Sequence, residues 1–167
     1  GITLGALLQG VKVDGRAYAG GWLDWLSPFS LLTGVSVVVA YALLGACWLI
    51  WKTEGGTQGH AFRLARPLGF ATLGAIVAVS LATPFLDYDY FSRWFEWPRA
   101  LLTAPVPVAV AIFALLFGRA LAQKREGQPF LLALALFALT FVGLGINLYP
   151  WIVPDAVTIW DAAAPEK

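Results

Sequence analysis

The sequence predicts an all-α fold, a polytopic bundle of transmembrane helices, and two observations support this prediction. The first is composition: 59% of the 167 residues are hydrophobic, 13% are charged, and the mean hydropathy is +0.74. Soluble domains carry about 25% charged residues, so a chain this apolar needs lipid as the solvent for much of its surface. The second is a set of four apolar runs, each close to the roughly 20 residues that a helix needs to cross the hydrocarbon layer.

Each run is apolar on all sides and begins at or near a proline. A proline at a helix start costs little, because the N–H that it lacks would have no partner there. The only charge within the runs is Arg119, near the end of the third. The four predicted spans are residues 28–51, 68–86, 104–122 and 129–150. Residues 1–10 are predicted to be the end of a further transmembrane helix that begins before Gly1, so the chain is interpreted as a fragment of a larger membrane protein.

The segments between the spans are predicted as loops on alternating sides of the membrane. Lys and Arg gather in two compact loops close to span ends, and such loops tend to be cytoplasmic. Residues 52–67 and 123–128 are therefore assigned to the cytoplasm. The predicted periplasmic loops are residues 11–27, 87–103 and 151–167.

Tryptophan and aspartate dominate the periplasmic loops. An indole ring has an apolar body and a polar N–H, so tryptophan at a span end is first interpreted as an interfacial anchor; contact with a quinone or a haem is the alternative. The charged carboxylate of aspartate favours an aqueous position for such a loop and can accept hydrogen bonds from backbone N–H groups. The anchor and interface candidates are Trp22, Asp24, Trp25, Trp151, Trp160 and Asp161.

The spans contain few groups that could carry chemistry, so no catalytic residue, cofactor-binding residue or metal ligand is predicted. Membrane enzymes and transporters usually hold ionisable side chains at bilayer depth. His60 is the only histidine and is predicted to be solvated in its loop, while Cys47 is predicted to pack as a small hydrophobe. The net charge of +1 argues against a nucleic-acid partner. The hydroxyls expected to bond to their own helix are those of Thr33, Ser36, Thr72, Ser80 and Thr140.

Small residues recur every fourth position in two spans. Such stripes allow helix backbones to approach closely in lipid, so both are predicted to be helix contacts. They comprise Gly74, Ala78, Ala82 and Ala114, Gly118, Ala122.

Several stretches, in order, resemble subunit II of the bacterial cytochrome bd-type quinol oxidases. The resemblance covers essentially the whole chain, from the end of the family's fourth helix to the loop before its eighth. The stretches are "GALLQGV" (5–11), "YAGGWLDWLSPFSLLTG" (18–34), "YALLGACWLIWKTEG" (41–55), "SLATPFLDYDYFSRWF" (80–95) and "VTIWDAAAP" (157–165).

The resemblance implies a non-haem subunit of an enzyme that oxidises quinol and reduces dioxygen to water in the bacterial inner membrane. It implies that haems b and d are ligated by subunit I, for which this multi-pass subunit acts as a scaffold. It also allows for a bound quinone and for a small single-span subunit, beside lipid and quinol as partners. The family's proton-path carboxylates lie on helices before the start of this sequence, so none is carried over to a residue here.

Two alternatives from other functional classes stay open. The first is a fragment of a secondary transporter, although transporters favour broken helices and a polar site at the midplane, whereas these spans are mostly continuous. The second is a purely structural membrane assembly protein. Substrate uptake into vesicles would identify the transporter, and co-purification of a haem-bearing subunit would identify the oxidase.

Overall fold

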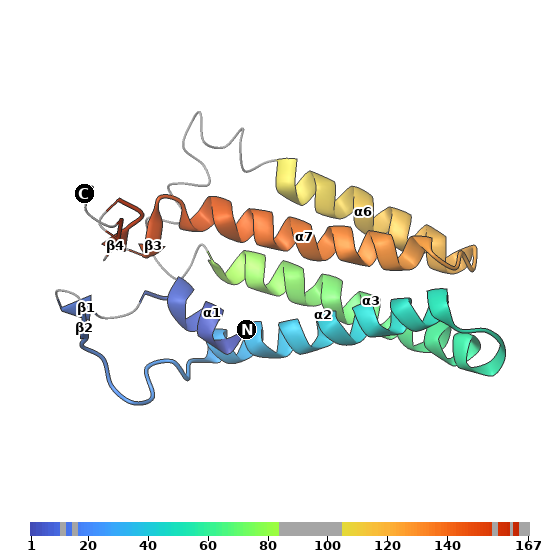
Figure 1. Ribbon diagram of the computed structural model, residues 1–167, viewed down its shortest axis with the longest axis horizontal. Helices are drawn as coiled ribbons and strands as arrows, with labels where there is room; N and C mark the ends of the chain where they lie inside the picture. The colour runs from blue at the N-terminus through green and yellow to red at the C-terminus, as the bar shows by residue number, and fades with distance from the viewer. Residues whose placement is uncertain (11–12, 15–16, 84–104, 155–156, 161, 164–167) are drawn as a thin grey trace.

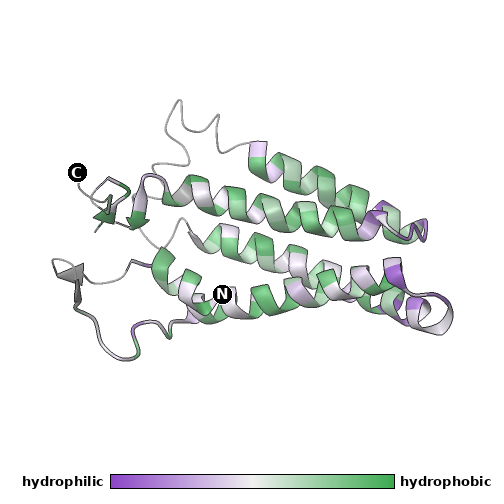
Figure 2. Cartoon of the chain, viewed as in Figure 1, coloured by the Kyte–Doolittle hydropathy of each residue, from purple (hydrophilic) through white to green (hydrophobic). Residues whose placement is uncertain are grey.

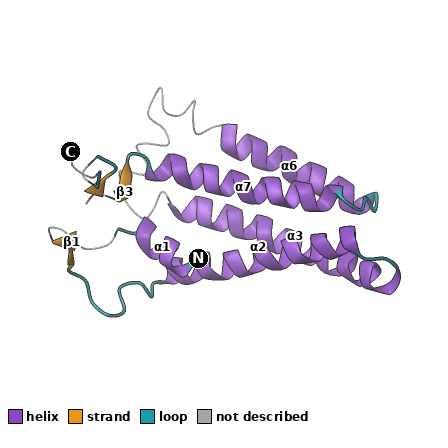
Figure 3. Cartoon of the chain, viewed as in Figure 1, coloured by secondary structure: helices purple, strands orange, loops and turns teal. Residues whose placement is uncertain are grey.

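A computed structural model describes residues 1–10, 13–14, 17–83, 105–154, 157–160 and 162–163. Four long helices lie alongside one another in this part of the chain, which confirms the all-α bundle (Figures 1 and 3). Each is long and apolar enough to cross a membrane. The helices are α1 (Ile2–Leu8), α2 (Pro28–Lys52), α3 (Gly55–Ala82), α6 (Pro105–Ala122) and α7 (Gln128–Leu148).

The two ends of the bundle differ in structure. The α2–α3 and α6–α7 turns lie together at one end, here called the turn end (Figure 1). Two short antiparallel hairpins lie at the other, the hairpin end. Their strands are β1 (Val13–Asp14) with β2 (Ala17–Tyr18), and β3 (Trp151–Val153) with β4 (Val157–Thr158). The predicted loops 11–27 and 151–167 therefore contain strands, while the predicted loop 87–103 falls outside the described residues.

Helix α2 agrees with the first predicted span to within one residue at its end. Ser27 and Ser30 form a reciprocal capping box at its start: the Ser30 N–H donates to Ser27 Oγ at 3.0 Å and the Ser27 N–H donates to Ser30 Oγ at 2.9 Å. Such a cap satisfies backbone donors that have no partner within the helix. The helix ends at Lys52, after which the Thr53 N–H donates to the Leu49 carbonyl at 3.0 Å.

Helix α3 corrects the prediction of a cytoplasmic loop over residues 52–67. The helix begins at Gly55, passes through Pro67 and leaves only Thr53 and Glu54 between α2 and α3. The sequence favours a helix start at Pro67. Inside a helix, a proline removes one backbone hydrogen bond, a loss that transmembrane helices tolerate. Packing outweighs that loss, because Ala61 and Ala65, one turn apart, are 1% and 0% exposed.

Helices α6 and α7 form a second hairpin whose turn has a defined geometry. The Arg125 N–H donates to the Ala120 carbonyl at 3.0 Å and the Lys124 N–H to the Leu121 carbonyl at 3.2 Å. This is the hydrogen-bond pattern of a Schellman motif, which requires a left-handed residue after the helix. Lys124 supplies it with φ 52°, although glycine is the usual residue there. The turn occupies residues 123–127, and Gln128, the last residue of the predicted loop 123–128, already belongs to α7.

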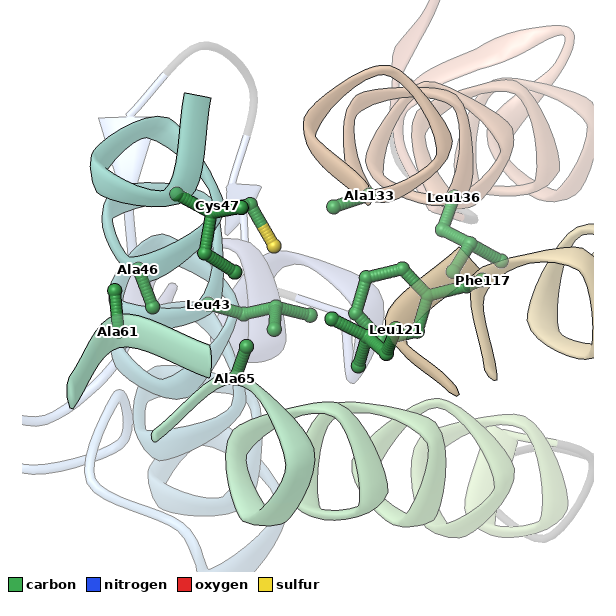
Figure 4. Close-up of a cluster of buried hydrophobic side chains, with 10 residues drawn as sticks. Leu43, Ala46, Cys47, Ala61, Ala65, Phe117, Leu121, Ala133 and Leu136 are labelled. Carbon is green, nitrogen blue, oxygen red and sulfur yellow. The ribbon is translucent and has the colours of Figure 1, made fainter. Parts of the chain in front are cut away.

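The core lies where all four long helices meet, toward the turn end (Figure 4). Cys47 is fully buried within it and packs as a small hydrophobe, as predicted. Elsewhere the helices stay largely uncovered: at most 28% of the residues in their most apolar windows are buried, and Figure 2 shows apolar residues along their length. Leu43, Ala46, Cys47 and Ile50 from α2 meet Ala61, Ala65, Phe117, Leu121, Ala133 and Leu136 from the other three helices.

Close helix contacts occur at glycines outside the predicted stripes. A methyl group added to Gly74 or Gly118 would have no neighbour within 4 Å, so neither glycine makes a close helix contact within the described chain. A methyl group on Gly5 would instead lie 2.1 Å from Thr33 Oγ1, and one on Gly69 would lie 2.8 Å from the Phe117 ring. Composition reveals small residues, but it does not reveal which helix face meets a neighbour.

The span hydroxyls largely behave as predicted. Ser36 donates to the Leu32 carbonyl at 2.6 Å and Thr72 to the Leu68 carbonyl at 2.8 Å. The Thr140 hydroxyl donates to the Phe137 carbonyl at 2.6 Å. Thr33 Oγ1 lies 2.8 Å from the Ser30 carbonyl, so it too satisfies its hydroxyl within its own helix.

Candidate functional site

A tight turn before α2 positions three of the predicted anchor residues. The carboxylate of Asp24 accepts the Gly21 N–H at 2.8 Å, and the indole N–H of Trp25 donates to the Trp22 carbonyl at 2.7 Å. These bonds close the turn on itself. The Trp22 side chain is 96% exposed, so its whole ring faces the surroundings of the chain at the hairpin end.

The β3–β4 hairpin positions the other pair of predicted tryptophans. Trp151 lies opposite Thr158 in the strand register, and the Ile159 N–H donates to the Pro150 carbonyl at 3.0 Å. Trp160 is 65% exposed, and its ring lies 6.4 Å from that of Tyr149 in an edge-on arrangement. Both tryptophans therefore belong to one small hairpin at the same end as Trp22, while Asp161 falls outside the described residues.

A set of hydrogen bonds around the start of α2, two of which reach the α1 segment, was not predicted from the sequence. Ser27 Oγ donates to the Gln9 side-chain oxygen, and the fully buried Ser30 hydroxyl lies 2.6 Å from the Trp25 carbonyl. Thr33 Oγ1 also lies 3.1 Å from the Gly1 carbonyl. The spacing of the two serines in "SPFS" is a helix-start signal, and it could have located the cap of α2. It carries no information about the contact with α1.

An aromatic cluster forms at the turn end, where α2 meets α7. The Trp48 ring lies 5.2 Å from Phe130 and 5.7 Å from Trp51. The Lys52 ammonium lies 4.3 Å from the centre of the Trp51 ring, within the range of cation–π attraction. Aromatic rings with a terminal cation are typical of a membrane–water interface.

His60 and Cys47 carry side chains that can ligate a metal or a haem iron, and the structure places them in different surroundings. His60 is exposed on α3, with Arg63 Nη2 3.5 Å from its Nδ1, so it is solvent-facing as predicted but helical rather than in a loop. Cys47 is enclosed by apolar neighbours. Within the described part of the chain, no group of three or more His, Cys, Asp or Glu side chains could hold a metal ion.

Four long apolar helices, with aromatic clusters at both ends, define a multi-pass membrane protein. Residues 1–167 match the family model described as cytochrome bd terminal oxidase subunit II, and the chain belongs to that family. The resemblance found in the sequence is thereby confirmed.

Two curated bacterial relatives show the same relationship at low identity. The chain is 24% identical over 158 residues to cytochrome bd ubiquinol oxidase subunit 2 of Bacillus subtilis, covering 94% of this chain and 45% of that protein. It is 22% identical over 202 residues to the probable cytochrome oxidase subunit 2 of Haemophilus influenzae, covering 99% of this chain and 53% of that protein. The chain thus spans about half the length of the curated relatives that it matches.

Proposed function

We propose that this chain is part of the non-haem membrane subunit of a cytochrome bd-type terminal oxidase, which oxidises quinol and reduces dioxygen to water. Its role is to support a haem-bearing subunit I in the bacterial inner membrane. The family match over residues 1–167 carries the proposal. Each of the four long helices that the structure describes runs unbroken, which favours this function over a transporter, because transporter sites form at interrupted helices.

The surroundings of His60 and Cys47 support placing haems b and d in the partner subunit. An exposed histidine beside an arginine offers no apolar enclosure for a porphyrin, and a thiol packed among leucine and alanine side chains leaves no room for one. The largely uncovered helix surfaces offer area for a partner as well as for lipid. A bound quinone and a small single-span subunit are compatible with the same surfaces.

The test is purification of the full-length protein from membranes, followed by haem analysis of whatever accompanies it. We expect a haem-bearing subunit to co-purify, with a reduced-minus-oxidised spectrum that is unchanged by His60→Ala or Cys47→Ala. Oxygen uptake driven by quinol should accompany that complex. Haem that stays with this subunit after separation, or is lost in either variant, would refute the assignment of the haems to the partner.

The hairpin end is proposed to face the periplasm and to fix the position of the bundle through its tryptophans. Replacing Trp160 and Asp161 together by alanine should lower the yield of assembled, haem-loaded complex. Ile152→Ala is the matched control, because Ile152 is also an exposed apolar residue on the β3–β4 hairpin, at 45%. Equal yields from the double variant and the control would remove the anchoring role.

A further inference from the structure

An open pocket lies at the turn end, where α6 ends and α7 begins. Its volume is about 490 Å³. Two arginines and two amide side chains line it, together with leucines from both helices. The residues that matter here are Arg119, Gln123, Arg125, Gln128, Leu116 and Leu132.

The pocket concentrates positive charge without an internal counter-ion. Arg125 Nε donates only to the neutral amide oxygen of Gln123, at 3.3 Å. Among the described residues, no carboxylate forms an ion pair with Arg119 or Arg125. The stretch 119–126 holds three cations and one carboxylate, Glu126, which gives it a net charge of +2 and leaves the pocket attractive to an anion.

The Schellman turn brings the two guanidinium groups into one pocket. The left-handed Lys124 reverses the chain, and the bond from the Arg125 N–H to the Ala120 carbonyl holds Arg125 beside the last turn of α6. Arg119 lies on that turn. The α7 helix then begins beside them with no side-chain cap, so its N-terminal N–H groups, apart from the one that Pro129 lacks, add to the positive potential.

The apolar lining distinguishes the expected ligand from a free anion. Leu116 and Leu132 lie about one turn further into α6 and α7 than the polar residues, toward the membrane interior. An anionic group at the arginines would thus stand at the membrane surface, with hydrocarbon directly beneath it. This is the arrangement of a phospholipid, whose phosphate and acyl chains need both environments.

We propose that this pocket binds the headgroup of an anionic phospholipid, with an acyl chain along the Leu116 and Leu132 side of the α6–α7 hairpin. The inference requires only that the bundle spans a membrane, so it stands apart from the proposed oxidase function. An inorganic phosphate site and an acidic surface of a partner subunit are the competing explanations.

The test uses the full-length complex in nanodiscs of defined composition and measures tightly bound lipid by native mass spectrometry. Phosphatidylglycerol should be retained in preference to phosphatidylcholine. A basic residue near an anionic surface contributes about fivefold to affinity, so Arg119→Gln with Arg125→Gln should weaken phosphatidylglycerol binding by about 25-fold. The control is Arg63→Gln with Arg66→Gln, which removes the same charge from the exposed face of α3 at the same end, and should leave binding unchanged.

The single variant Arg125→Gln tests the proposal if the double variant fails to assemble, because Arg125 lies in the turn rather than in a helix. It should weaken phosphatidylglycerol binding by about fivefold. Equal loss in the α3 control would overturn the proposal in favour of general charge attraction. Displacement of phosphatidylglycerol by inorganic phosphate at equal concentration would overturn it in favour of a soluble anion. Loss of the partner subunit with lipid binding unchanged would assign the pocket to that partner.

Discussion

The contact between α1 and α2 at Gly5 allows a quantitative prediction. A methyl group at this position would lie 2.6 Å from the Ser30 Cα and 2.1 Å from Thr33 Oγ1. The hydroxyl could rotate away, but the Ser30 backbone could not, so α1 would have to move by about 1 Å to restore ordinary van der Waals contact. Overpacking of this kind costs about 2 kcal/mol, and alanine's better helix propensity returns about 1 kcal/mol.

Gly5→Ala should therefore lower the free energy of unfolding by about 1 kcal/mol. Gly45→Ala is the matched control: Gly45 is also helical, but no atom lies within 4 Å of the added methyl group, so this variant should gain about 0.5–1 kcal/mol. The measurement is denaturant unfolding of the full-length protein in bicelles, followed by tryptophan fluorescence. The predicted difference between the two variants is about 1.5–2 kcal/mol.

Removing the side-chain part of the clash gives a further check. Thr33→Ala in the Gly5→Ala background eliminates the Oγ1 contact but leaves the Ser30 Cα in place, so it should restore only part of the lost stability. The reasoning is refuted if Gly5→Ala is as stable as Gly45→Ala, because α1 would then not pack on α2 as closely as described.

Three further variants test individual contacts by the same unfolding measurement. Lys124→Gly should stabilise the chain by about 0.5–1 kcal/mol, because glycine adopts the left-handed conformation without the steric cost that lysine bears. Gln58→Leu should destabilise it by about 1 kcal/mol, since the Gln58 amide donates to the Ile50 carbonyl at 3.0 Å in the last turn of α2. Gly69→Ala should cost about 1 kcal/mol through contact with the Phe117 ring, and the cost should shrink in a Phe117→Leu background; equal costs in both backgrounds would exclude that contact.

The helix content of the bundle could be predicted because an apolar run of about 20 residues has few other stable forms in lipid. The start of α3 could not, since "GGTQGHAFRLARP" combines glycines, polar residues and a proline. What makes this stretch helical is tertiary: Ala61 and Ala65 fit closely against α2. Local sequence signals carry no information about such a partner, so they place a boundary at Pro67 where the helix in fact continues.

The predicted anchors could be located by residue type, but their geometry could not. Tryptophan at a span end indicates an interface, yet the Asp24 turn and the β3–β4 hairpin depend on bonds between particular backbone groups. Strands of two or three residues are too short to show alternation. The arginine pocket was missed because it requires a left-handed conformation at Lys124, which a sequence without glycine there does not suggest.

The two-residue connection between α2 and α3 has a consequence for biosynthesis. With only Thr53 and Glu54 outside regular structure, the nascent chain passes from one membrane helix to the next almost without interruption. Ala46 and Ala61 then face each other within a single hairpin, which can close before α6 and α7 have been translated. The pair should accordingly leave the insertion machinery together, so a charge placed in the middle of α2 should hinder the membrane entry of α3 as well.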